Sequence, residues 1–143
     1  MNTEGVIAQI ARIRELANAL IEMELRKRSI QGIVPAHGDV MMFLFRQDEP
    51  VPMKAVVENV RRVKSTVTVM MNTLVKYGYV QKIPCETDYR VTYVELTPKG
   101  RKLRKDFDEI SVLLREKIYG NMAVKDREGL IKLLTEMEQN MRT

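Results

Sequence analysis

The stretch that decides the fold runs from residue 64 to residue 97 and reads KSTVTVMMNTLVKYGYVQKIPCETDYRVTYVELT. In its first half, apolar side chains recur every three or four residues, which predicts a helix over residues 64–77. The side chains predicted to be buried are Val67, Met70, Met71 and Leu74. Gly78 stands where a left-handed residue commonly ends a helix.

After Gly78 the apolar period changes from 3.6 to 2. We therefore expect strands over residues 79–83 and 91–96, joined by a polar hairpin tip over 84–90. Working outward, the same patterns predict helices over residues 5–29, 36–47, 53–60, 98–119 and 124–142, with a proline-containing turn over 48–52. Thr97 and Pro98 supply a hydroxyl cap and a proline at the first position of the helix that follows.

The predicted order is four helices, two strands and two helices. Two short helices, a tight connection and a hairpin are the order of a winged helix-turn-helix. The fold class is thus mainly α with a small β-wing, and residues 36–100 form the winged domain. The apolar stripe of helix 5–29 is broad enough for two neighbours. We therefore assign residues 1–35 and 101–143 to a helical dimerisation region.

The basic residues concentrate in the centre of the chain. Between Lys54 and Lys105 there are 12 Lys or Arg against 4 Asp or Glu, whereas the rest has 12 against 15. Such a block favours an anionic partner such as nucleic acid, although it is also compatible with a solvated face. One Cys and one His are too few for a disulfide or a Cys/His metal site, and no cofactor motif is present. No signal peptide or membrane-spanning run is expected, so the cytoplasm is the expected compartment.

The outer face of the helix over 64–77 suits the major groove of DNA. It carries the residues Lys64, Ser65, Thr68, Val69 and Asn72. Small polar groups approach base edges closely, and the helix N-terminus favours a phosphate. Arg61 and Arg62 lie beside that N-terminus, and no acidic residue occurs from 61 to 77. The alternative is an ordinary solvated face.

At the hairpin tip, Asp88 and Arg90 are two residues apart. On an extended segment they would project from the same side, so the carboxylate can hold the guanidinium in one orientation. A fixed arginine on a protruding wing suits insertion into the minor groove. The alternative is a surface ion pair that contributes little to stability.

The wing resembles that of the MarR (multiple antibiotic resistance regulator) family. The family signature is Asp-x-Arg, then apolar-x-Leu-Thr, then Gly three residues on; here it falls on Asp88, Arg90, residues 94–97 and Gly100. Residues 64–68 resemble the start of the family's recognition helix. The family's Leu, Gly and apolar residue before the wing fall on Leu74, Gly78 and Val80.

The resemblance implies a homodimer whose terminal helices interleave and whose two winged domains straddle a palindromic operator in double-stranded DNA. Arg90 would enter the minor groove, and Ser65, Thr66 and Thr68 would contact bases or phosphates in the major groove. The chain departs from the family pattern where Val69 replaces a frequent Arg, Val63 a capping Ser, and Arg61-Arg62 a turn that often contains Gly. The added arginines would favour affinity over sequence discrimination.

Similar proteins bind small aromatic or phenolic effectors between the two regions. The residues of this chain that could line such a pocket are Met23, His37, Met41, Met42 and Phe45; plain core packing, or for His37 a surface position, is the alternative. Cys85 has Glu86 beside it and no adjacent cation, so nothing in the sequence indicates a lowered pKa or a redox sensor.

Three classes of function remain in view. The first is a sequence-specific DNA-binding regulator, released from DNA by a ligand if it is a repressor. The second, motivated by Val69, is a winged-helix protein-interaction module. An enzyme is the third, and it is disfavoured because no catalytic residues, Gly-rich phosphate loop or nucleophile elbow can be identified.

Overall fold

The computed structural model describes residues 1–142; the final residue of the expected dimerisation region, Thr143, lies outside them. The helix predicted over 64–77 is α4 (Lys64–Lys76), and its four predicted core residues are all buried. It ends at Gly78, whose φ of +80° is left-handed. There the N–H of Tyr79 donates to the carbonyl of Leu74, and the N–H of Gly78 to that of Val75. This pair of bonds is the Schellman cap, so the predicted end of the helix is confirmed.

The wing is an antiparallel hairpin of β2 (Val80–Pro84) and β3 (Thr92–Leu96), close to its predicted bounds. A third strand, β1 (Val51–Pro52), pairs with the other edge of β3 and gives the order β1-β3-β2. The prediction of a simple turn over 48–52 is therefore wrong at its end. Two prolines exclude a helix there, but a proline is tolerated in an edge strand because it lacks only the donor that the ladder does not need.

The remaining helices divide between the winged domain and the terminal segments. They are η1 (Pro35–His37), α2 (Gly38–Phe45), α3 (Met53–Val60), α1 (Val6–Lys27), α5 (Pro98–Arg101), α6 (Arg104–Tyr119) and α7 (Val124–Arg142). The bounds predicted for α3 and α7 are confirmed. The helix predicted over 36–47 begins as a 3-10 turn and is shorter than expected.

The prediction of a single helix over residues 98–119 is wrong, because the segment divides into α5 and α6. Its start is as expected: the Thr97 hydroxyl accepts the N–H of Gly100 at 3.1 Å. The same hydroxyl donates to the carbonyl of Gly78 at 2.5 Å, and the Thr97 N–H donates to that of Tyr79 at 3.0 Å. These bonds fix α5 against the end of the sheet, and α6 then departs to pack against α1.

Gly100 permits this close packing. A Cβ at this position would collide with the backbone carbonyl oxygen of Tyr79. We expect Gly100→Ala to lower the free energy of unfolding by about 1–3 kcal/mol, since backbone atoms cannot yield as a side chain does. Gly38→Ala is the matched control: a Cβ there meets open space in a helix, so it should be neutral or stabilising by roughly 0.5–1 kcal/mol. Chemical denaturation compares the two, and equal effects would contradict the packing argument.

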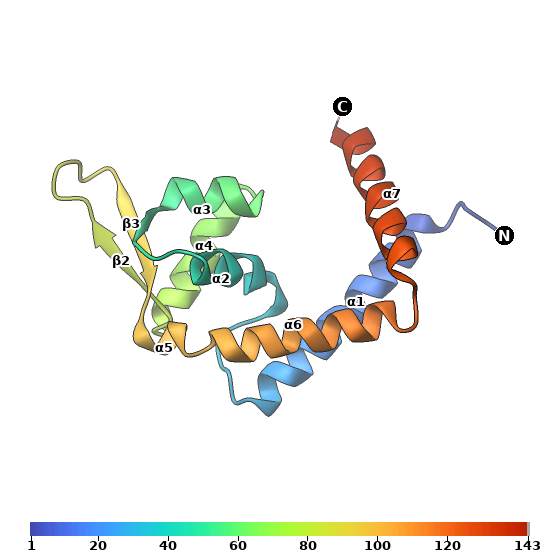
Figure 1. The fold of residues 1–143 in the computed structure, drawn as a ribbon. Coiled ribbons are helices and arrows are strands. Elements are labelled where there is room, and N and C mark those ends of the chain that lie inside the picture. Colours follow the sequence, from blue (N-terminus) through green and yellow to red (C-terminus); the bar gives the residue numbers. More distant parts are fainter. Residues whose placement is uncertain (143) are drawn as a thin grey trace.

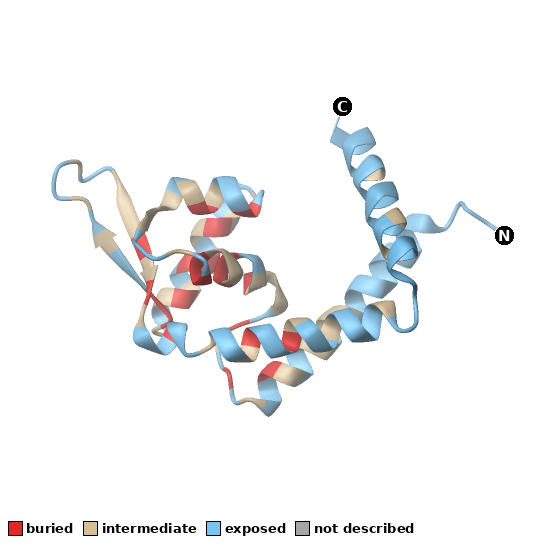
Figure 2. Cartoon of the chain, viewed as in Figure 1, coloured by how far each residue is buried: buried red, intermediate tan, exposed pale blue. Residues whose placement is uncertain are grey.

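Most of the core lies within the winged domain (Figure 2), where Met41, Leu44, Met71 and Leu74 are fully buried; Leu25 of α1 and Phe107 and Ile110 of α6 also belong to it. The long helices α1 and α6 run side by side and extend away from it, and α7 stands apart from the winged domain (Figure 1). Arg28 joins them after the end of α1: its guanidinium pairs with Asp106 at 3.0 Å and with Glu109 at 2.5 Å, both on α6. The hairpin projects from the opposite end of the molecule, which leaves its tip accessible.

Candidate DNA-binding surface

The turn between α3 and α4 contains one residue in an unusual backbone conformation. Arg61 has a φ of +53°, which is left-handed and explains why a Gly is favoured at this point. Val63 takes the N-cap position in an extended conformation, and no side chain caps α4. The first N–H groups of α4 therefore have no side-chain acceptor, which suits a bound anion.

The outward face of α4 carries the residues expected there. Lys64, Ser65 and Asn72 are exposed, Thr66 and Thr68 are half-buried, and Val69 has 66% of its surface exposed. The Thr68 hydroxyl donates to the carbonyl of Lys64 at 2.9 Å. Asn72 receives a hydrogen bond of 2.7 Å from the Lys82 ammonium on β2. The wing and α4 thus share a polar surface, with Val69 as an apolar member.

The two arginines of the turn are placed differently. Arg61 is exposed, whereas Arg62 is half-buried and its guanidinium lies 3.7 Å from the Asp39 carboxylate on α2. The ion pair holds the Arg62 side chain against α2. The sequence did not indicate Asp39 as its partner, because the two residues are far apart along the chain. Arg61 is the arginine of this turn that faces solvent more fully.

The pairing of Asp88 with Arg90 at the wing tip is confirmed. The Asp88 carboxylate accepts the Arg90 Nε at 3.0 Å, its Nη2 at 3.2 Å and its backbone N–H at 3.1 Å. The segment is a turn closed by the Val91 N–H on the Asp88 carbonyl, not the extended segment assumed from spacing. The Arg90 bonds lower the pKa of Asp88, so the carboxylate stays charged. Arg90 remains 81% exposed and is held in one orientation.

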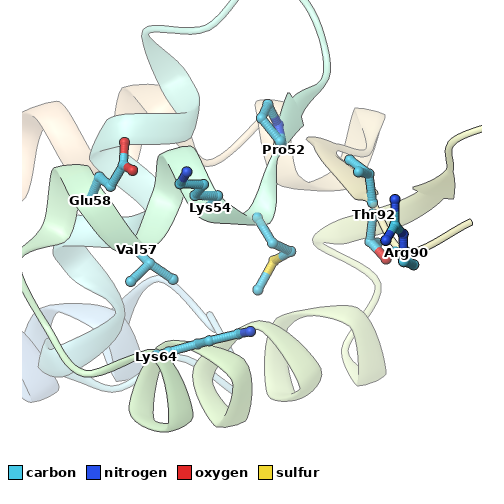
Figure 3. A pocket seen from close by; sticks show the side chains of 9 residues that line it. Pro52, Lys54, Val57, Glu58, Lys64, Arg90 and Thr92 are labelled. Atoms are coloured by element: carbon cyan, nitrogen blue, oxygen red, sulfur yellow. The ribbon is translucent and has the colours of Figure 1, made fainter. Parts of the chain in front are cut away.

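Lys54 is a residue that sequence reasoning missed. It lies in the first turn of α3 and lines an open groove of about 550 Å³ together with Lys64 and Arg90 (Figure 3). The only signal was its place at the start of the basic block. Lys54 lies near Arg90 because β1 pairs with β3 and α3 follows β1 directly.

Cys85 corrects another expectation. Its Sγ lies 3.2 Å from the Thr87 hydroxyl oxygen, and hydrogen bonding by this side chain and by the backbone of Asp88 and Thr87 lowers the pKa of Cys85. The sequence suggested no such shift, since no cation is adjacent. The donors come from the fold of the hairpin tip itself.

The five residues considered for an effector pocket do not form one site. A cleft of about 80 Å³ does lie between α1, α2 and α6, but of the five only Met42 lines it. Met23 is exposed, Met41 is fully buried, and Phe45 packs edge-on against Phe107 with ring centroids 5.4 Å apart. The cleft is instead lined by residues such as Ile21, Ile33, Val34 and Ile110.

His37 is buried, with 6% of its surface exposed, and is not the surface residue that a helix start suggested. Its Nδ1 accepts the backbone N–H of Val34 at 3.0 Å. Burial lowers its pKa. A lowered pKa in the folded state means that the unfolded chain binds the proton first as the pH falls below about 6.5. The stability that depends on neutral His37 is therefore present above that pH and is lost below it.

We expect the denaturation midpoint of the wild type to fall more between pH 7 and pH 5 than that of His37→Asn. The asparagine oxygen can accept the Val34 N–H but does not titrate in this range. Acidic groups common to both proteins cancel in the comparison. Parallel pH profiles for the two proteins would contradict the assignment.

Two other kinds of site are absent from the described residues. Over residues 1–142, His, Cys, Asp and Glu side chains form no group of three or more that could hold a metal ion. In the same part of the chain no helix is both long and apolar enough to span a membrane.

Comparison with known proteins agrees with this architecture. Residues 37–100 match the family described as the winged helix DNA-binding domain. Among curated protein sequences no match was found.

Solved structures superpose over nearly the whole chain. A MarR transcriptional regulator from Methanosarcina mazei Go1 is 24% identical, with 96% of each chain covered and a TM-score of 0.76. MepR of S. aureus, in a complex with DNA, is 18% identical and covers 98% of this chain and 99% of its own, with a TM-score of 0.82. BpsR of Bordetella bronchiseptica, whose DNA binding is regulated by 6-hydroxynicotinic acid, is 19% identical over 96% of each chain, with a TM-score of 0.78. The resemblance noted in the sequence is thus confirmed: residues 37–100 match the winged helix DNA-binding domain, and the chain as a whole has the fold of the MarR-type structures.

Proposed function

We propose that the protein is a transcription regulator, not an enzyme, that binds double-stranded DNA sequence-specifically in the cytoplasm. The observation that carries this proposal is the pairing of an uncapped, acid-free α4 with a wing whose Arg90 is fixed and exposed. A helix for the major groove and an arginine for the minor groove then lie on one surface. The DNA complex of MepR, which has the same fold, supports the same use of that surface.

We further propose that it acts as a homodimer on a palindromic operator. None of the residues of α7 is buried, and α1 exposes a run of large apolar side chains. Such surfaces are costly in water and mark an interface. A two-fold dimer presents two winged domains to two half-sites, which gives a palindrome with half-sites about one helical turn apart.

Selection of bound duplexes from a random DNA pool at about 150 mM salt tests both proposals. Enrichment of a palindromic motif supports them. Binding without enrichment, seen only at low salt, would argue against sequence-specific reading.

The exposed Val69 favours one alternative, a protein-interaction module. Salt separates the two: a DNA complex with ~6 phosphate contacts loses affinity steeply as salt rises, whereas an apolar protein interface loses little.

We also propose that the protein is a repressor released by a small aromatic or phenolic effector. The cleft between α1, α2 and α6 supports a site for such an effector. It lies between the terminal helices and the winged domain, and its lining is mainly apolar. Its volume of about 80 Å³ is below the ~150 Å³ that holds benzene in an engineered cavity. Binding therefore requires the cleft to widen, which would move α6 relative to α2. Weaker operator binding in the presence of 6-hydroxynicotinic acid or a related phenol would support the proposal, and no effect across a panel would argue against it.

A further inference from the structure

A groove lies between α3, the start of α4 and the beginning of β3. It is open to solvent and has a volume of about 550 Å³. Figure 3 shows Arg90 and Thr92 on one side of it and Val57 and Glu58 on the other, with Lys64 extending from α4 toward the wing. The groove therefore separates the two elements that the proposed function places in neighbouring grooves of DNA.

The charges around the groove favour an anion. Lys54, Lys64 and Arg90 line it, and the one acidic lining residue is Glu58. Within residues 1–142 neither lysine forms an ion pair. Of the Arg90 guanidinium, Asp88 binds the Nε and Nη2 atoms. The groove thus presents two lysines without an ion-pair partner in the described chain, beside an arginine.

Part of the lining of the groove is apolar. It is formed by Pro52, Met53, Val57 and Val91. An inorganic anion would leave these apolar side chains without a partner. A nucleic acid backbone alternates charged phosphates with the less polar carbon atoms of its sugars, so it can contact both the cations and the apolar side chains.

The geometry of duplex DNA fixes which segment would lie there. If α4 enters the major groove and Arg90 the adjacent minor groove, the strand that separates these two grooves must cross the protein between α4 and the wing. We infer that the groove seats this backbone segment and that Lys54 is one of its phosphate ligands. The inference rests on the proposed function and assigns a partner to a surface that the base-reading residues do not explain.

The experiment uses the full chain and a duplex recovered by the selection described above. The salt dependence of binding is measured for the wild type, Lys54→Gln, Lys54→Arg and the control Lys102→Gln, an exposed lysine outside the groove. The slope of log K against log salt should decrease by about 0.9 for each phosphate that Lys54→Gln no longer neutralises. The slope of Lys102→Gln and that of Lys54→Arg should both equal the slope of the wild type. Glu58→Gln should change affinity in the opposite direction and tighten binding.

A second measurement locates the contact on the DNA. Single phosphates are replaced by uncharged methylphosphonates along the strand between the major-groove and minor-groove contacts. At one position the methylphosphonate should weaken binding by the wild type. The same replacement should have little further effect on Lys54→Gln, because that variant already lacks the pair between Lys54 and the phosphate. An unchanged slope and unchanged sensitivity in Lys54→Gln would overturn the inference while the proposed function stands. Absence of duplex binding by the wild type would overturn both. Binding of benzoate that depends on Lys54, with an unchanged DNA slope, would assign the groove to small organic anions instead.

Discussion

Arg90→Ala is expected to weaken operator binding by on the order of 1–3 kcal/mol per half-site, which is about 5- to 150-fold. The reason is the geometry of the wing tip. Arg90 is 81% exposed, yet the Asp88 carboxylate holds it through two side-chain bonds and one backbone bond. Little side-chain entropy is therefore left to lose when the guanidinium enters the minor groove. Titration of a labelled operator duplex at constant salt measures the change.

The matched control is Arg101→Ala, which removes an exposed arginine from α5, away from the wing. It should reduce affinity much less. Asp88→Asn retains Arg90 but weakens the charge-assisted bonds, so it should lower affinity by less than Arg90→Ala and add little to it in the double variant. Full affinity of Arg90→Ala would remove the wing from the mechanism.

The sequence predicted best what depends on neighbours along the chain. The buried face of α4, its end at Gly78 and the cap at Thr97 follow from periodicity and from side chains three to five residues apart. The Asp88–Arg90 pair was also foreseen, although through the wrong backbone conformation. A turn and an extended segment can both bring residues i and i+2 together.

The errors share a different cause, which is contact between segments distant in sequence. Strand β1 exists because β3 offers it an edge, and α5 separates from α6 because Gly100 lies against Tyr79. His37 is buried by packing that no local pattern records.

The structure separates the candidate effector residues for the same reason. Helical spacing identifies the apolar face of a helix, but it does not indicate which other element packs against that face. Met41 and Phe45 therefore lie in the core, whereas Ile33 and Val34, from a connection that carries no periodicity, line the cleft. For the same reason the sequence did not reveal the groove around Lys54, whose lining comes from β1, α3, α4 and β3.

The exposed apolar residues of α7 lead to a second prediction, which concerns the association of two copies of the chain. This helix has 19 residues and not one of them is buried, although its sequence carries the apolar periodicity of a packed helix. Leu130, Ile131 and Leu134 are exposed along it. An isolated helix with so little packing is marginally stable in water, so its order requires a partner surface. The exposed apolar residues of α1 in a second copy provide one of matching chemistry.

We therefore expect Leu134→Glu to convert the proposed homodimer to a monomer, because a two-fold interface would bury the new carboxylate twice without a partner. Lys132→Glu is the control, since it adds a carboxylate on the opposite side of α7. Analytical ultracentrifugation should show a monomer for Leu134→Glu at concentrations where the wild type and the control are dimers. Operator affinity should fall by roughly 10²–10⁴-fold, because the two half-sites are then bound independently. The affinity for an isolated half-site should stay the same, since the core that supports α4 and the wing includes no residue of α7. A dimeric Leu134→Glu protein would place the interface elsewhere, and equal loss on the half-site would show that the substitution had damaged the winged domain itself.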